Sequence, residues 1–271
     1  MRSGNDAAVA LATHIGGSIE EFANLMNNKA KEIGLTNTNY VTPHGLDNPN
    51  HYTTALELAK LTDYSLKNEI FATIVKTKYA TIMINGETKE IKNTNEILCA
   101  NYDGVYGVKT GFTNNAGRCL VTAIKRNNID LIIVVLGADT KKDRGNDTIK
   151  LIDYAYKNYR IENIEEKVKV EFENWKNINQ DRIYIHKGSS KINTIIGEIP
   201  IKEIVSNSDI TVDINSITYL EAPIEKNEQV GIINVKRDNE TIEQIKILIE
   251  KEIKKMNMLD YCKLFAKTIC M

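Results

Sequence analysis

The sequence contains no long apolar run and little proline. No stretch of its 271 residues approaches the ~18 consecutive apolar residues that a membrane-spanning helix needs. The first residues lack a basic region followed by an apolar one, so no export signal is visible, which taken alone predicts a cytoplasmic chain. There are four prolines and no low-complexity tract. With 42% hydrophobic and 26% charged residues, the composition is typical of an ordinary folded protein.

Cysteine is also scarce and shows no pattern that suggests a metal site or a disulfide framework. No two cysteines form a Cys-x-x-Cys pair, and none has a histidine at ligand spacing. We therefore expect neither a bound metal nor a network of disulfides. The four cysteines are Cys99, Cys119, Cys262 and Cys270.

Charge of either sign is not in excess. The chain has 35 Lys and Arg against 36 Asp and Glu, a formal net charge of −1. Proteins that bind nucleic acid usually show a basic excess, so the balance predicts no nucleic-acid partner. The length suits one large domain or two ordinary ones.

The first part of the chain shows helical periodicity. Asn5 or Asp6 could cap a first helix, and Gly16-Gly17 would end it. Ser18, with a glutamate three residues later, forms a capping box for a second helix. Thr53 or Thr54 would begin a third helix after a loop rich in turn residues.

After residue 70 the apolar period shifts towards two, as in strands. Asn85-Gly86 is a typical hairpin turn. Three further strand patterns, at residues 105–113, 117–125 and 130–138, are joined by short links and predict an antiparallel meander. A helix over residues 146–159 could pack on this sheet. The first domain is therefore predicted to span residues 1–164.

The pattern changes near Glu166. Short alternating stretches separated by turn residues predict a small all-β domain, a sandwich or a barrel, over residues 165–246. Its first strand would be "EKVKVEF" at residues 166–172.

The last segment, residues 247–271, predicts a basic amphipathic helix. From residue 251 onward it carries five lysines against two acidic residues, a net charge of +3. Such helices bind membrane surfaces, and packing on the same domain or on a partner is the alternative. The residues that share its apolar stripe are Met258, Tyr261, Cys262, Phe265 and Ile269.

Two tripeptides bear on chemistry, Ser3-Gly4-Asn5 and Lys109-Thr110-Gly111. Each is weak evidence alone, because Ser3 suits a helix cap and Lys109 suits an exposed strand. Together they match the second and third motifs of penicillin-recognising serine enzymes, which carry S-x-x-K, S-x-N and K-T-G in that order.

The segments around these motifs resemble the low-molecular-mass penicillin-binding proteins, which are serine-type D-alanyl-D-alanine carboxypeptidases. The resemblance covers most of residues 3–160 and includes "YVTPHGLD" and "NTNEILCANYDGVYGVKTG". It extends to an all-β second domain followed by an amphipathic anchor. It implies an α+β fold: a β-lactamase/transpeptidase-like domain, with an antiparallel sheet and helices and incomplete at its N-terminus, then the all-β domain and the tail helix.

The resemblance also implies an activity and a location. Family members remove the terminal D-Ala from peptidoglycan stem peptides through an acyl-serine intermediate, and no cofactor is implied. The full-length protein would bind β-lactam antibiotics and lie at the extracytoplasmic face of the cell membrane. A β-lactamase would share the motifs, although the second domain and the basic tail argue against a free-standing one.

Site roles follow from the resemblance residue by residue. Ser3 would relay a proton, and Asn5 would hold the substrate amide. Arg144 would bind the terminal carboxylate through two parallel hydrogen bonds, with a solvated loop charge as the alternative. The residues that would line the site from one strand are Lys109, Thr110 and Gly111. His44, in "PHGLD", is interpreted as structural.

The sequence departs from the family pattern in two respects. At Thr94, where some relatives carry an arginine, a second basic contact is missing. No S-x-x-K precedes Ser3, so the chain lacks the nucleophile and its base and is expected to be inactive as it stands. Three explanations account for the missing S-x-x-K motif. The first is a misassigned start or an interrupted gene, the second is that the chain is one half of a split protein, and the third is that it is a non-catalytic binder of peptidoglycan stem peptides.

Overall fold

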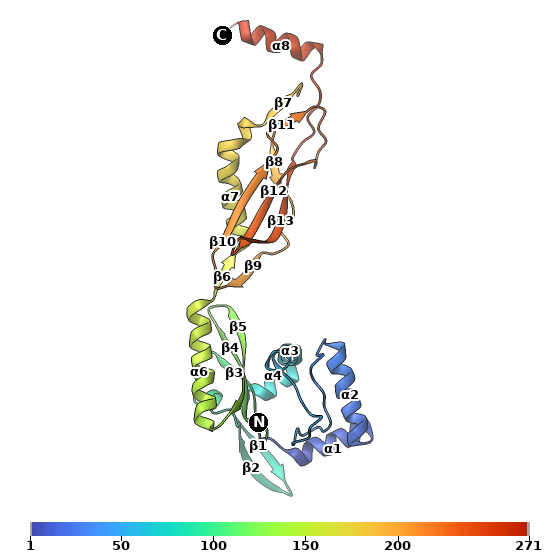
Figure 1. Cartoon of the computed structure of the whole chain (residues 1–271), viewed down its shortest axis with the longest axis vertical. Helices are drawn as coiled ribbons and strands as arrows, with labels where there is room; N and C mark the ends of the chain where they lie inside the picture. Colours follow the sequence, from blue (N-terminus) through green and yellow to red (C-terminus); the bar gives the residue numbers. More distant parts are fainter. Residues whose placement is uncertain (1, 270–271) are drawn as a thin grey trace. The chain divides into compact units, whose positions relative to one another are not determined.

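The computed structural model describes residues 2–269, and its contacts divide the chain into two compact units (Figure 1). One unit runs up to Asn158, and the other begins at Tyr159. The sequence suggested a boundary between residues 164 and 165. Cys270 and the side chain of Ile269, both assigned to the tail helix, lie outside the described residues.

The helices of the first unit begin and end largely where the local sequence predicts. Ser18 Oγ accepts a hydrogen bond from the Glu21 backbone N–H at 3.0 Å, and Thr54 caps its helix in the same way. The predicted cap at Asn5 or Asp6 is wrong: Gly4 is the N-cap residue and makes no side-chain hydrogen bond. The helices are α1 (Asn5–Gly16), α2 (Ile19–Glu32), α3 (Ala55–Leu66), α4 (Glu69–Lys76), α5 (Glu96–Cys99) and α6 (Lys141–Asn158).

The predicted meander is confirmed as a three-stranded antiparallel sheet, in the order β3 (Val105–Thr113), β4 (Gly117–Arg126) and β5 (Ile129–Ala138). Figure 1 shows α6 on one side of the sheet and α3 with α4 on the other. A separate hairpin joins β1 (Tyr79–Ile84) and β2 (Glu87–Lys92). Its turn residues Asn85 and Gly86 both have positive φ, as a tight hairpin requires.

The first unit has apolar helix faces that no described residue covers. Leu11 and Ile15 on α1 are each 62% exposed, and Leu56 on α3 is 67% exposed. One buried cluster beneath the sheet is small, formed by Val75, Val108 and Ala123.

The second unit is mostly strand but contains one long helix, α7 (Ile164–Asn179), so it is not all-β as predicted. The stretch at residues 166–172, predicted as a strand, lies inside this helix. Val168, Phe172 and Trp175 recur at helical spacing and are buried, whereas Val170 is exposed. The apolar alternation within residues 166–172 therefore does not mark a strand, because the same residues belong to a longer helical period.

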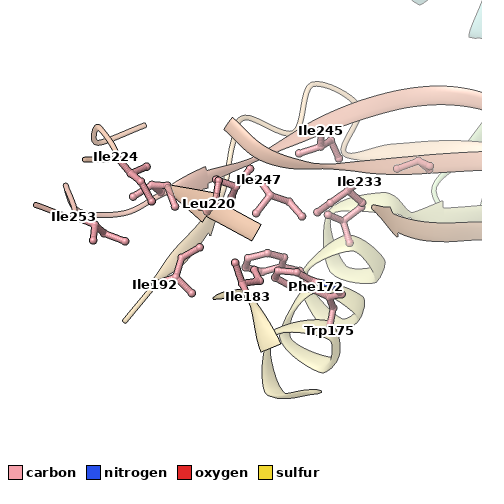
Figure 2. Close-up of a cluster of buried hydrophobic side chains, with 14 of the residues drawn as sticks. Phe172, Trp175, Ile183, Ile192, Leu220, Ile224, Ile233, Ile245, Ile247 and Ile253 are labelled. Carbon is pink, nitrogen blue, oxygen red and sulfur yellow. The ribbon is translucent and has the colours of Figure 1, made fainter. Parts of the chain in front are cut away.

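A four-stranded antiparallel sheet, in the order β10-β12-β13-β8, packs against α7. Figure 2 shows Phe172 and Trp175 of α7 facing Ile233 and Ile247 of the sheet. Smaller pairs flank it: β6 with β9, antiparallel, and β7 with β11, parallel. The elements are β6 (Arg160–Asn163), η1 (Gln180–Arg182), β7 (Tyr184–His186), β8 (Thr194–Ile196), β9 (Glu203–Ser206), β10 (Ile210–Ser216), β11 (Tyr219–Glu221), β12 (Gln229–Arg237) and β13 (Glu240–Ile249).

The tail helix starts later than the predicted residue 247. Strand β13 continues to Ile249, and single bridges then tie Ile253 to Ile224 and Lys255 to Gly188. Only after these does α8 (Met258–Ile269) begin. Among residues 2–269, no helix combines the length and the apolar character needed to cross a membrane.

Candidate active site

The two tripeptides line one cleft of about 980 Å³ in the first unit. Ser3 and Asn5 reach it from the start of α1, the Lys-Thr-Gly residues from β3, and Arg144 from the first turn of α6. Motifs 106 positions apart in the sequence therefore share one surface. The predicted site residues that line the cleft are Ser3, Asn5, Lys109, Thr110, Gly111 and Arg144.

Strand β3 presents its motif at an edge of the sheet. It pairs with β4 on one side, while the sheet order leaves its other side without a strand neighbour among the described residues. Alternation along the strand buries Val108 and exposes Lys109. Gly111 is exposed, and a Cβ there would make only an ordinary contact with Cys119 at 3.6 Å. Glycine at this position keeps the strand surface bare.

Lys109 lies where the cleft reduces its contact with water. Desolvation, followed by repulsion from the Arg144 charge, lowers the pKa of the Lys109 ammonium group below its ordinary value of 10.5. Its Nζ donates to the Thr110 carbonyl oxygen at 2.5 Å. Part of the side chain remains exposed, so water moderates both effects.

Arg144 is buried rather than a solvated loop charge, so that alternative is wrong. Its Nη2 donates to both carboxylate oxygens of Glu96, at 2.6 and 2.7 Å. Nη1 donates to the Cys119 carbonyl oxygen at 3.4 Å, and Nε is buried without a described partner. The guanidinium thus already holds a carboxylate at the wall of the cleft.

Glu96 is a cleft residue that the sequence reading missed. Two buried asparagines on either side of Thr94 hold this segment in place. Asn95 donates to the Gly107 carbonyl oxygen at 3.0 Å and caps α5, and Asn93 accepts from the Asn95 backbone N–H at 3.0 Å. Thr94 and Glu96 both line the cleft. The sequence signal that could have identified this segment is the pair of asparagines, Asn93 and Asn95, directly before helix α5.

Thr94 and His44 also line the cleft. The hydroxyls of Thr94 and Thr110 lie 2.7 Å apart, so a neutral hydrogen-bonding pair stands where a basic contact was missing. His44 Nδ1 accepts from the Leu46 backbone N–H at 3.1 Å, which supports the structural interpretation of this histidine.

Comparison with known proteins agrees with the geometry. The profile of the D-alanyl-D-alanine carboxypeptidases matches residues 1–140. The chain belongs to this family. A second profile, the C-terminal domain of penicillin-binding protein 5, matches residues 197–255. The mixed helix-and-sheet fold is therefore that of the penicillin-binding proteins, and the second unit contains their C-terminal domain over residues 197–255.

Several carboxypeptidases are similar along nearly the whole chain. DacF of Bacillus subtilis is 32% identical over 97% of this chain and 66% of its own length. DacA of Escherichia coli K12 is 32% identical over 97% of this chain and 64% of its own length. The chain thus spans less than two thirds of the length of four such curated relatives, between 61% and 66%.

Solved structures give the same picture. Penicillin-binding protein 6B from Escherichia coli has a TM-score of 0.63 at 26% identity, covering 90% of this chain and 65% of that one. The Streptomyces K15 DD-transpeptidase has a TM-score of 0.51 at 35% identity, covering 55% of this chain and 61% of that one.

Proposed function

We propose that this chain forms the proton-relay and substrate-binding part of a serine-type D-Ala-D-Ala carboxypeptidase that acts on peptidoglycan stem peptides. The observation that carries the proposal is the shared cleft, which Ser3, Asn5, the Lys-Thr-Gly strand and Arg144 all line.

The open edge of β3 supports peptide binding by strand addition. An extended peptide can pair with the free backbone groups of an edge strand. The bare surface at Gly111 allows that approach, because a glycine has no side chain to hold the substrate away. Asn5 then lies in the same cleft to hold the substrate amide.

The charges of the cleft support a substrate that ends in a carboxylate. Lys109 and Arg144 supply two positive charges against the one negative charge of Glu96, and Ser3 can pass a proton towards the leaving amine. The attacking serine of an S-x-x-K motif is not among the 271 residues. The acyl-serine step therefore requires a serine that this polypeptide does not supply.

Peptide binding tests this proposal directly. Isothermal titration of the chain with a peptide ending in D-Ala-D-Ala should give saturable binding, and the L-Ala-L-Ala peptide should bind at least about tenfold more weakly. Lys109→Gln should weaken binding at least about tenfold, since a charged hydrogen bond contributes roughly 1.5–3 kcal/mol. Lys125→Gln on β4, outside the cleft, is the matched control. Equal binding of both peptides, or an unaffected Lys109 variant, would contradict the proposal.

A non-catalytic binder of peptidoglycan stem peptides is the second candidate, because the substrate-binding groups that line the cleft would serve binding alone. Labelling membranes of the source organism with a fluorescent penicillin separates the two. A labelled band whose tryptic peptides derive from this chain supports the carboxypeptidase. If peptides of this chain occur only in unlabelled bands, the binder is favoured.

We also propose that α8 binds the membrane surface and, from the family resemblance, that the full-length protein lies at the extracytoplasmic face of the membrane. Its support is the set of large apolar side chains that α8 exposes, together with the lysines of the tail. These side chains are Met258, Leu259, Tyr261, Leu264 and Phe265.

A further inference from the structure

Three aromatic rings form a cluster on β7 and β11, away from the core of the second unit. In the parallel pair, Tyr184 stands directly opposite Tyr219, and the two ring centroids lie 5.7 Å apart with an interplanar angle of 30°. The His186 ring lies 6.3 Å from Tyr219 and 6.4 Å from Tyr184. We call these three residues the aromatic cluster.

The aromatic cluster is not part of the fold's core. Tyr184 is 59% exposed and Tyr219 is 54% exposed. Their strand neighbours Ile183 and Leu220 point the other way and are buried in the apolar core. Packing of the core therefore accounts for an isoleucine and a leucine at these positions. It does not account for the two large, adjacent tyrosines, which face outward.

The chain returns to this place just before α8. The Met256 backbone N–H donates to the Lys187 carbonyl oxygen at 2.8 Å, and the Ser189 N–H donates to the Lys254 carbonyl oxygen at 2.8 Å. Lys187 directly follows His186. Because α8 starts at Met258, two residues after this anchor, it leaves the unit beside the aromatic cluster (Figure 1).

The charges near the aromatic cluster are mostly positive. Two ion pairs lie here, Lys187 with Glu221 at 3.8 Å and Lys254 with Glu252 at 3.2 Å. Lys255 pairs with Gly188 in the same stretch and is exposed. The residues that these contacts place beside the aromatic cluster are therefore three lysines, Lys187, Lys254 and Lys255, against two glutamates.

We propose that the aromatic cluster is a second contact of the second unit with an anionic lipid surface, beside the contact made by α8. The inference rests on the membrane role proposed for α8. Tyrosine suits the boundary between headgroups and acyl chains, because its ring is apolar and its hydroxyl stays in water. The lysines complement the negative charge of the lipid. The cluster would thus hold this edge of the unit against the membrane, so that α8 is not the sole attachment.

A sugar chain fits the same rings less well. Sugars stack on open aromatic faces, whereas Tyr184 and Tyr219 turn ring faces towards each other. This contact covers one face of each tyrosine ring, and the His186 ring also stacks on Tyr219, so less open ring face is left for a sugar, which favours the lipid boundary over a glycan.

Flotation with lipid vesicles tests the inference on the full chain. Vesicles of phosphatidylcholine with phosphatidylglycerol should bind the chain, and pure phosphatidylcholine vesicles should bind it more weakly. Tyr184→Ser with Tyr219→Ser should lower the apparent partition coefficient about tenfold. Tyr52→Ser with Tyr79→Ser is the matched control, because those tyrosines are 54% and 51% exposed in the first unit, and it should change binding less than twofold.

A separate variant distinguishes the aromatic cluster from α8. Leu264→Ser with Phe265→Ser should also weaken binding. If only this α8 variant loses binding, the aromatic cluster inference is overturned and the α8 proposal stands. If only the tyrosine variant loses binding, the α8 proposal fails instead. If the tyrosine variant keeps vesicle binding but loses binding to isolated peptidoglycan, the lipid assignment is overturned in favour of a glycan.

Folding of each variant is checked through Trp175, the single tryptophan, which is 8% exposed in the core of the second unit. Its emission maximum should stay unchanged. If the double tyrosine variant shifts that maximum, the two single variants carry the test, since each keeps one ring in place. Each single variant should then lower vesicle binding, and unchanged binding in both would overturn the inference.

Discussion

Arg144 of α6 and Glu96 of α5 form an ion pair in the wall of the cleft, with Nη2 at 2.6 and 2.7 Å from the two carboxylate oxygens. The Arg144 side chain is 4% exposed, whereas that of Glu96 is 44% exposed. Glu96 can therefore swing into solvent, but Arg144 cannot. If Arg144 binds the substrate carboxylate as proposed, the carboxylate of Glu96 competes with the substrate for the same Nη2 donor.

Replacing Glu96 by glutamine should tighten the binding of a peptide ending in D-Ala-D-Ala by about three- to tenfold. The variant removes a competing negative charge, and an ion pair at a partly exposed site contributes about 1 kcal/mol. Isothermal titration measures the change, and Glu90→Gln on the exposed hairpin is the control. Weaker binding would show instead that Glu96 serves to hold Arg144 in place.

Replacing Lys109 by methionine should stabilise the fold slightly at pH 7. The pKa of Lys109 is lowered in the folded state, first by desolvation and then by Arg144, so its charged form opposes folding. This penalty is present below the folded-state pKa and disappears as the pH rises through it towards 10.5, because the unfolded chain then binds more protons.

The measurement for Lys109 is the difference in unfolding free energy between the variant and the wild type. We expect at most about 0.5 kcal/mol at neutral pH, discounted for the exposure of the side chain. The difference should shrink as the pH rises towards 10.5. A difference that grows with pH would contradict the assigned shift.

Replacing Glu57 by glutamine should lower the melting temperature at pH 7 and flatten its fall in acid. Burial alone would raise the pKa of Glu57. Hydrogen bonds to the carboxylate outweigh this effect of burial and lower the pKa. They are donated by Thr38 Oγ1 at 2.5 Å and by the Asn37 backbone N–H at 2.9 Å. The resulting stability is present above the ordinary value of 4.5 and is lost as the pH falls through the folded-state pKa.

Thermal melts between pH 3 and pH 7 check the Glu57 prediction, with Glu20→Gln on the exposed part of α2 as the control. The wild type should lose melting temperature below pH 4.5 more steeply than the Glu57 variant. Parallel curves for the two proteins would show that Glu57 does not anchor the turn at Asn37 and Thr38.

A polypeptide of these 271 residues should form no covalent adduct with a labelled penicillin. Acylation requires an activated serine, and the sequence contains no S-x-x-K. Fluorescent gel analysis should show no stoichiometric label. Penicillin-binding protein 5 from Haemophilus influenzae, a solved structural neighbour, is the positive control. A clean one-to-one adduct would mean that another residue of the chain serves as nucleophile.

Replacing Phe172 by alanine should destabilise the second unit by about 3–5 kcal/mol, because the ring is buried in the core and stacks on Trp175 at 5.6 Å. Val170→Ala, on the exposed side of the same helix, should cost no more than about 0.5 kcal/mol. Urea unfolding followed by Trp175 fluorescence measures both. Equal losses would contradict the helical assignment of residues 166–172.

Local signals in the sequence determined much of the first unit. Ser18 and Thr54 cap their helices because each hydroxyl accepts a hydrogen bond from the backbone N–H three residues later. This contact is local and needs no distant part of the chain. Asn85-Gly86 and the short links after β3 and β4 set the hairpin and the meander for the same reason. The motifs at Ser3 and Lys109 were readable as a pair through their resemblance to one family.

Only the tertiary structure decided which residues meet. Glu96 and Arg144 are 48 positions apart, and no local pattern pairs them, because the contact depends on how α5 and α6 pack around β3 and β4. The helix α7 was misread because three alternating apolar residues within residues 166–172 resemble a strand, while the sheet it covers selects the longer helical period of Val168, Phe172 and Trp175. Local chemistry determines turns and caps, whereas long-range packing decides the charge environment of the cleft.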